Sequence, residues 1–270
     1  MCDLLEVSSS GYYDWKNRPE SYRSKRHKKL LHKIEQAHQD SGEIYGSPRI
    51  HKDLQEDGEI VGVNTVAALM RRKGIQSKVH KRFVITTDSR KSLDPAPNLL
   101  DRDFVAEKPN QKWVSDVTFI PTREGWLYLA TIMDLYSRMI VGWAMNKSNT
   151  TELILAALDM ALEQRGRPES VLLHSDQGSQ YTSTNYQKEL TSSRLVCSMS
   201  RKGECWDNAA MESFYHSLKT EWVNFEDYKT RSQARTSLFQ YIELFYNRKR
   251  RHSSINYRSP MAFEQAAGVH

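Results

Sequence analysis

Apolar and polar residues alternate along the middle of the chain in a pattern that predicts a β-sheet. From 113 to 121, successive side chains fall on opposite faces of a strand, and apolar residues occur on both faces. Asp116 stands in the middle of this stretch. Two further strand-like segments follow at 126–133 and 138–145, separated by short turns. The pattern therefore predicts three antiparallel strands joined as a meander.

A change of period after the meander predicts alternating helices and strands. Apolar residues recur at helical spacing from Asn149 or Thr150 to about Gln164, and Gly166 and Pro168 end this helix. The remaining elements are expected in this order: a buried strand at 171–174, a helix from Ser183 or Thr184 to about Leu190, a strand at 196–199, and a long helix that starts near its expected cap, Asp207 or Asn208. The order of elements indicates an α/β fold.

The amino-terminal part of the chain is predicted to be helical. A basic helix is expected at 22–39, and a second helix at 48–55 is followed by a turn at 58–62. Asn64 is expected to cap a third helix. Three basic residues end that helix: Arg71, Arg72 and Lys73. Cations also suit the dipole at a helix carboxyl end, so DNA contact and a purely structural role both remain open.

Composition divides the chain into two predicted domains. Residues 86–98 include the run Asp94-Pro95-Ala96-Pro97 and little apolar pattern, which is typical of a linker. We predict a helical module at 1–85 with a helix-turn-helix near 45–75, a linker at 86–105, and a core at 106–270 that includes a basic carboxyl-terminal helix.

Three acidic residues are the strongest candidates for chemistry. Asp116 lies within a strand, Asp176 follows a strand and Glu212 lies one turn into a helix, with 35 residues between the last two. Carboxylates gathered in a partly buried site repel one another unless a cation compensates them. Hard oxygen ligands favour Mg²⁺ or Mn²⁺, and two such ions support phosphodiester chemistry. The alternative is that the three are unrelated surface or capping acids.

Two neighbours of these acids are weaker candidates. Lys219 lies seven residues after Glu212, on the same helical face, where it could contact a phosphate or simply be solvated. His174 precedes Asp176 by two residues, and it could orient the site, bind phosphate or pack at the strand end.

Charge is compatible with a polyanionic partner. The net charge is +6, and basic residues gather near the end of a helix expected at 232–247. This basic cluster is Arg248, Lys249, Arg250 and Arg251. It could contact DNA phosphates or form a helix-terminal charge group. No apolar segment of roughly 18 residues and no signal-peptide pattern occurs, so we expect a soluble, cytoplasmic protein.

Several stretches of the sequence, which span about 113–264, together form a set of motifs that is specific for one protein family. They are KWVSDVTFI, GWLYLATIMDLYSRMIVGWAM, HSDQGSQYTS, SMSRKGECWDNAAMESFYHSLKTE and FYNRKRRHSSINYRSPMAFE. In these stretches the chain resembles integrase-type transposases of bacterial insertion sequences, namely the second-reading-frame (OrfB-type) product of the copy-out, paste-in group, which is related to retroviral integrases. The resemblance implies a ribonuclease-H-like core with an amino-terminal helix-turn-helix module. It places the family's metal-binding acids on Asp116, Asp176 and Glu212, and its basic catalytic-helix residue on Lys219.

The resemblance also implies an activity and partners. The expected enzyme is a DDE-type transposase that uses two Mg²⁺ or Mn²⁺ ions to cleave DNA at the ends of its element and to transfer the strands. Its expected partners are DNA, further copies of the chain, and an upstream-frame protein or a frameshift fusion with it. Two other classes remain open: a nuclease that uses only water as its nucleophile, and a DNA-binding regulator without catalysis.

Overall fold

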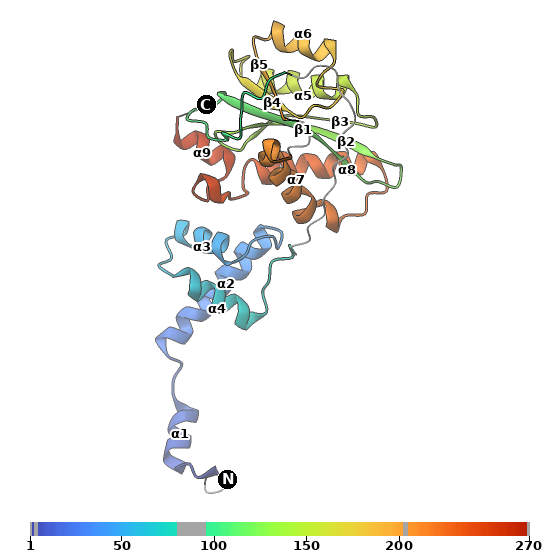
Figure 1. Ribbon diagram of the computed structural model, residues 1–270. Coiled ribbons are helices and arrows are strands. Elements are labelled where there is room, and N and C mark those ends of the chain that lie inside the picture. The colour runs from blue at the N-terminus through green and yellow to red at the C-terminus, as the bar shows by residue number, and fades with distance from the viewer. Residues whose placement is uncertain (1, 3–4, 80–95, 202–204, 269–270) are drawn as a thin grey trace. The chain divides into compact units, whose positions relative to one another are not determined.

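The computed structural model describes residues 2, 5–79, 96–201 and 205–268. The chain divides into two compact units, Met1–Lys78 and Val79–His270, and each is described by itself (Figure 1). Residues 86–95 of the predicted linker lie outside the described residues, so the predicted domain boundaries stay predictions.

The first unit consists of helices around a small apolar core. Its elements are α1 (Ser9–Asn17), α2 (Tyr22–Asp40), α3 (Ser47–Glu56) and α4 (Val63–Lys73). Leu30 and Ile34 of α2 are buried together with apolar residues of α3 and α4, whereas α1 buries none of its side chains. Gly62, and not Asn64, occupies the N-cap of α4, so the predicted cap was wrong by two positions. Asn64 instead lies inside the first helical turn.

The second unit contains the predicted order of strands and helices. Its elements up to the long helix are β1 (Lys112–Ile120), β2 (Leu127–Asp134), β3 (Ile140–Asn146), α5 (Thr151–Gln164), β4 (Leu172–Ser175), α6 (Thr184–Ser192), β5 (Val196–Met199) and α7 (Ala209–Glu221). Within the described residues the five strands form one sheet in the order β3-β2-β1-β4-β5. The meander strands are antiparallel to one another, while β4 runs parallel to β1 and β5 runs parallel to β4. The predicted α/β fold of ribonuclease-H-like topology is confirmed.

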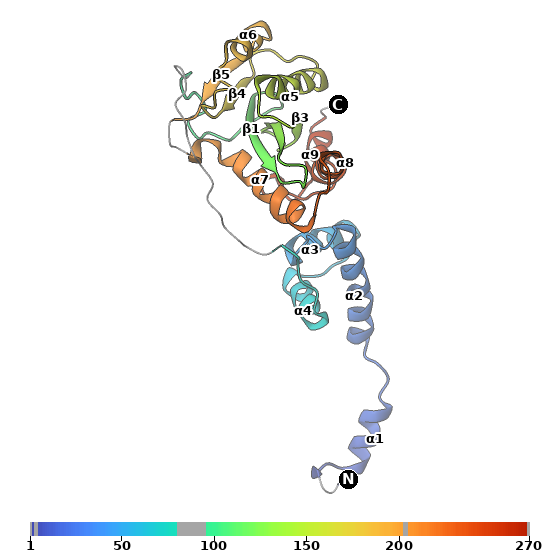
Figure 2. The same cartoon turned by 90° about the vertical axis from the view of Figure 1, so that its right-hand side faces the viewer.

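Helices cover both faces of the sheet. Helices α5 and α6 lie on one side and α7 lies on the other (Figure 1 and Figure 2). The α5 side is filled by apolar residues of the strands and both helices, including Trp113 and Leu158. Helix α5 approaches β3 so closely that a Cβ added at Gly142 would lie 2.2 Å from the carbonyl oxygen of Ala157. Glycine is therefore required at this position of the strand.

After α7, further helical segments form the carboxyl-terminal part of the chain. A capping box at Thr230 begins α8 (Arg231–Phe239), and a π-helical segment follows at Gln240–Tyr246. The predicted helix at 232–247 is therefore present, but its second half is widened. The last helix, α9 (Pro260–Ala266), carries Glu264, whose carboxylate forms a 2.6 Å ion pair with Arg165.

Candidate active site

Two of the predicted acids, Asp116 and Asp176, lie where the pairing between β1 and β4 ends. Strand β4 pairs with β1 only along Lys112–Val114, and it ends at Ser175. Asp176 therefore follows the end of β4 and lies beside Asp116 of β1. Burial, together with the nearby carboxylate of Asp176, raises the pKa of Asp116 to about 8. The pKa of Asp176 is also raised by partial desolvation, although its side chain remains exposed to solvent, which reduces the effect.

Backbone amides hold each aspartate in place. The amide of Val117 donates a 2.8 Å hydrogen bond to Oδ1 of Asp116, and the amide of Gly178 donates a 3.0 Å hydrogen bond to Oδ1 of Asp176. Within the described residues, the second oxygen of each carboxylate accepts no hydrogen bond. Both side chains are thus oriented by the chain and keep an oxygen for a ligand.

The third acid approaches from α7. Glu212 lies in the first turn of this helix, is exposed, and acts on Asp116 more weakly than Asp176 does. The hydroxyl of Tyr215 fixes the helix, because it donates a 2.6 Å hydrogen bond to the carbonyl oxygen of Asp116 and lies 2.8 Å from Oγ1 of Thr131. The local sequence pattern does not indicate this role of Tyr215.

The three acids do not form a closed cage. Across the part of the chain that the structure describes, no three His, Cys, Asp or Glu side chains are gathered closely enough to hold a metal ion together. Asp176 acts on the carboxyl group of Asp116 more strongly than Glu212 does. The candidate site therefore consists of two neighbouring carboxylates and a third on a helix tied to the same strand.

Lys219 lies on α7 with its ammonium 5.0 Å from the centroid of the Phe119 ring. Burial lowers the pKa of Lys219, and the nearby Asp116 opposes that change. Within the described residues its ammonium makes no hydrogen bond or ion pair. The lysine predicted to contact phosphate is therefore a half-buried cation at the rim of the acidic site.

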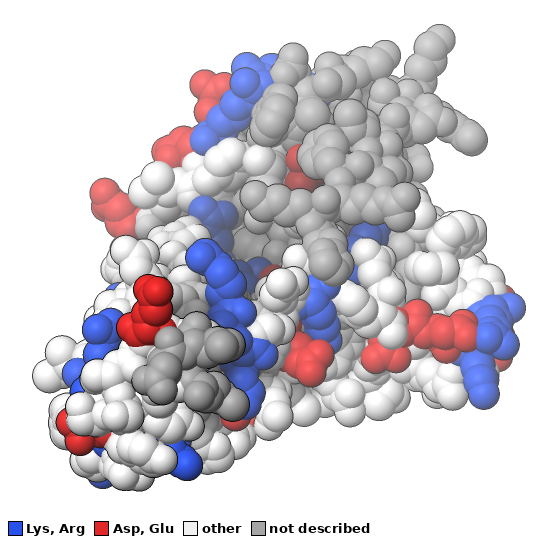
Figure 3. Space-filling view, turned by 90° about the horizontal axis from the view of Figure 1, so that it is seen from below, with Lys and Arg blue, Asp and Glu red and all other residues white. Residues whose placement is uncertain are grey.

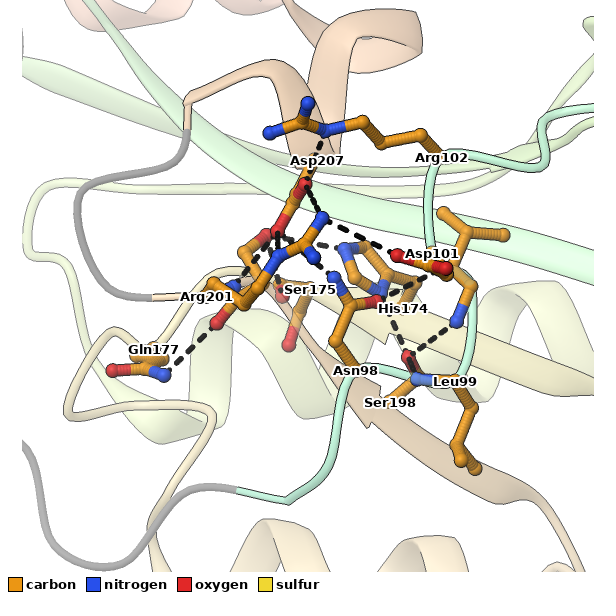
Figure 4. A network of polar contacts seen from close by, with 12 residues as sticks. Asn98, Leu99, Asp101, Arg102, His174, Ser175, Gln177, Ser198, Arg201 and Asp207 are labelled. Atoms are coloured by element: carbon orange, nitrogen blue, oxygen red, sulfur yellow. Dashed lines mark hydrogen bonds and ion pairs between the residues drawn. The ribbon is translucent and has the colours of Figure 1, made fainter.

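His174 has a structural environment. It is fully buried, with Nδ1 2.8 Å from Oγ of Ser198 and Nε2 3.1 Å from Oγ of Ser200 (Figure 4). Burial lowers the pKa of His174 to about 4, so the ring is neutral at pH 7. Of the three roles considered for His174, packing at the strand end fits, while phosphate binding does not.

Asp207 fastens the start of α7 to distant parts of the chain. Its buried carboxylate accepts hydrogen bonds from Asn98 and from Arg102, each at 2.8 Å, and from the backbone and guanidinium of Arg201 (Figure 4). Burial opposes ionisation, but these donors hold the pKa of Asp207 below its usual value. Of the two predicted caps, Asn208 occupies the N-cap position, without a side-chain capping bond, and Asp207 has this other role.

The basic cluster near the carboxyl end divides into two kinds of residue. Arg250 is buried, and its guanidinium forms two 2.6 Å hydrogen bonds with the carboxylate of Glu221. It has no exposed face for a phosphate, so the prediction that Arg250 contacts DNA is corrected to a role in the core. Arg248 and Lys249 are exposed, and Arg251 is partly exposed, with Nη1 bonded to the carbonyl oxygen of Tyr257.

The basic end of α4 is exposed. Arg71, Arg72 and Lys73 all face solvent, and Lys73 forms an ion pair with Glu35 at 3.3 Å. On the face that Figure 3 shows, Lys and Arg side chains lie among acidic ones. None of the helices in the described residues is long and apolar enough to cross a membrane.

The second unit has the architecture of an integrase core. Its five strands form a mixed sheet, and carboxylates stand in the middle of β1, at the end of β4 and on α7. Family models agree: two models described as "Integrase core domain" match residues 106–205 and 193–260, and one described as "HTH-like domain" matches residues 25–83. The fold and the site thus define a DDE-type polynucleotidyl transferase.

The family is shown by full-length relatives. "Transposase InsF for insertion sequence IS3A" of Escherichia coli (strain K12) is 43% identical over 266 residues, covering 98% of this chain and 92% of the relative. The "Insertion element IS600 uncharacterized 31 kDa protein" of Shigella sonnei is 43% identical over 265 residues, covering 98% and 97%. The chain belongs to the family of InsF-type transposases of IS3 insertion sequences.

Solved structures share a more distant likeness. The HTLV-2 integrase catalytic core domain in complex with magnesium (dimeric form) is 18% identical and covers 57% of this chain and 94% of its own, with a TM-score of 0.43. The simian T-cell lymphotropic virus intasome in complex with PP2A regulatory subunit B56 gamma is 14% identical, covers 85% and 73%, and has a TM-score of 0.49. The family assignment rests on the sequence relatives and the family models.

Proposed function

We propose that this transposase binds two divalent cations, Mg²⁺ or Mn²⁺, through Asp116, Asp176 and Glu212. The observation that carries the proposal is the position of Asp116 beside Asp176 in a partly buried site, because desolvation and the second carboxylate raise the pKa of Asp116 to about 8. Two such carboxylates can both be ionised at neutral pH only when a cation relieves their repulsion. When bound, such ions stabilise the attacking and leaving oxygens of a phosphodiester displacement.

The protein's share of the reaction is to position groups and to balance charge. The amides of Val117 and Gly178 limit rotation of the two aspartates, and Tyr215 ties the helix that carries Glu212 to β1. Lys219 contacts a non-bridging phosphate oxygen in this proposal. Hydrolysis would release a 3′ hydroxyl, which would then attack a second phosphodiester, and the chain would need no covalent bond to the DNA.

We further propose the residues that contact the DNA backbone outside the site. They are Arg71, Arg72 and Lys73 at the end of α4, and Arg248, Lys249 and Arg251 after the π-helical segment. All lie at least partly exposed, and cations of this kind bind phosphates by displacing counterions. Further copies of this chain on the DNA, and an upstream-frame protein or a fusion with it, are the partners that we propose.

A strand-joining assay tests this mechanism. The protein is incubated with Mg²⁺, Mn²⁺ or Ca²⁺ and labelled DNA that carries the ends of its own element, and it is compared with Glu212→Gln. Ser213→Ala is the matched control, because Ser213 is the next residue of α7 and is also exposed. We expect joined products with Mg²⁺ and Mn²⁺ from the wild type and from Ser213→Ala, and none from Glu212→Gln.

Each other outcome assigns a different class. Activity that survives Glu212→Gln would remove Glu212 from the metal site. Hydrolysis without joining would favour a nuclease. DNA binding without either reaction, also after fusion to the upstream frame, would favour a regulator.

A further inference from the structure

Two large aromatic side chains lie exposed near the acidic site. Phe119 is 43% exposed and Trp126 is 49% exposed, and their rings contact edge to face with centroids 4.9 Å apart. Phe119 lies three residues beyond Asp116 on β1, so the two side chains point to opposite faces of the strand, and Lys219 of α7 reaches the Phe119 ring. Exposed aromatic rings of this size are candidates for a contact surface, because burying them against a partner would be favourable.

The turn that presents these rings is held in place. The amide of Arg123 donates a 2.9 Å hydrogen bond to the carbonyl oxygen of Tyr228, and Nε of Arg231 donates a 3.0 Å hydrogen bond to the carbonyl oxygen of Trp126. Arg231 also donates its amide to Glu124 at 2.8 Å. The β1–β2 turn is thus fastened to the start of α8, so the aromatic pair is presented on a preorganised support.

The ammonium of Lys219 places a positive charge beside the aromatic pair, where it can attract a nucleic acid phosphate. This ammonium lies 5.0 Å from the centroid of the Phe119 ring, and Lys219 lies one helical turn after Tyr215, whose hydroxyl bonds to the carbonyl oxygen of Asp116. Lys219 therefore connects the aromatic pair to the acids. A nucleotide is the partner that suits this arrangement, because its base stacks on an aromatic ring while its phosphate pairs with an ammonium.

We propose that Phe119 and Trp126 form a stacking platform for an unpaired base of the DNA strand that enters the active site, with Lys219 on the phosphate of that nucleotide. The base must be unpaired, because bases inside a duplex are stacked on their neighbours and offer no free face. The transposase would thus prefer a frayed or single-stranded end to a blunt one. This selectivity rests on the proposed active site, since the platform serves the strand that reaches those acids.

Fluorescence of 2-aminopurine tests the platform without catalysis. The full chain is titrated, without divalent metal, into a duplex with a short overhang that contains 2-aminopurine, and into the matched blunt duplex. We expect quenching with the overhang, and roughly tenfold weaker overhang binding by Phe119→Leu and by Trp126→Ala, as for the loss of one stacked base. Trp126→Phe should retain the preference for the overhang, because it keeps an aromatic face.

Phe239→Ala is the matched control, because Phe239 has the same 43% exposure and its ring contacts Trp143 of the edge strand β3 instead of the aromatic pair. It should bind both duplexes as the wild type does. Unchanged overhang binding by folded Phe119→Leu and Trp126→Ala would overturn the proposal, and so would equal losses on both duplexes. Asp116→Asn separates the two hypotheses: it should abolish strand joining but retain the quenching.

Discussion

At the scale of single residues, the fold strongly changes the pKa of Asp116. Its ordinary pKa of 3.8 rises to about 8 in the folded chain, because the carboxyl group is partly buried and lies beside Asp176. Between these two values the folded protein binds more protons than the unfolded one. Without metal, the contribution of this protonated group to stability is therefore complete below pH 3.8 and is lost as the pH rises through 8.

Asp116→Asn should accordingly stabilise the metal-free protein at about pH 8 and have less effect at about pH 5. The difference between variant and wild type should grow by at most about 1.4 kcal/mol per pH unit. Thermal unfolding at several pH values measures it. Mg²⁺ should raise the melting temperature of the wild type in the alkaline buffer more than that of the variant, and an equal rise in both would contradict the metal assignment.

Arg250 shows how a residue in a basic cluster can serve the core instead of the surface. Arg250→Ala would leave the carboxylate of Glu221 buried without its cation, which typically costs about 3 to 5 kcal/mol. The exposed neighbour provides the control, since Arg248→Ala should change stability by no more than about 0.5 kcal/mol. Urea denaturation compares them. A stable Arg250→Ala protein with weakened DNA binding would return this residue to the interface.

At the scale of elements, hydrogen bonds at two points fix the position of α7. Tyr215 attaches the helix to β1, and Asp207 attaches its start to the segment that precedes the sheet and to Arg201. Both points lie within about two helical turns of Glu212. The position of Glu212 is therefore set by residues outside the proposed metal site.

Asp207→Ala should loosen the first turn of α7 and lower the rate of strand joining by roughly tenfold or more, while DNA affinity changes little. Hydrogen exchange of the amides of the first turn should become faster in this variant. Asp101→Asn is the control, because Asp101 is 74% exposed and its ion pair with Arg201 is at the surface. Unchanged exchange in Asp207→Ala would show that Tyr215 alone fixes the helix.

At the scale of the whole molecule, the chain combines a helical unit with an integrase core. The first unit carries exposed cations at the end of α4, and the second carries the acids. In the mechanism proposed above, the two units share one DNA molecule, so DNA affinity and catalysis can be changed separately.

Replacing Arg71, Arg72 and Lys73 with Ala should weaken DNA binding and flatten its salt dependence, by about 0.9 in the log–log slope for each phosphate that is no longer neutralised. Titrations between low and moderate salt measure the slope. Arg194→Ala changes an exposed cation that is paired with Glu169, so it should leave the slope unaltered. A triple variant with the slope of the wild type would confine these cations to a structural role in α4.

The sequence by itself determined the order of strands and helices, because alternation and helical spacing record which side chains face a core. It also singled out Asp116, since an acid within an apolar strand needs a partner or a metal, and the resemblance of the flanking motifs to a known family added Asp176 and Glu212. Only the tertiary structure decided which charged side chains are paired. Arg250 and Asp207 meet their partners across long stretches of chain, and a local pattern carries no record of such partners. The exposed pair of Phe119 and Trp126 was equally hidden, because a strand residue is buried or exposed according to what packs over its face.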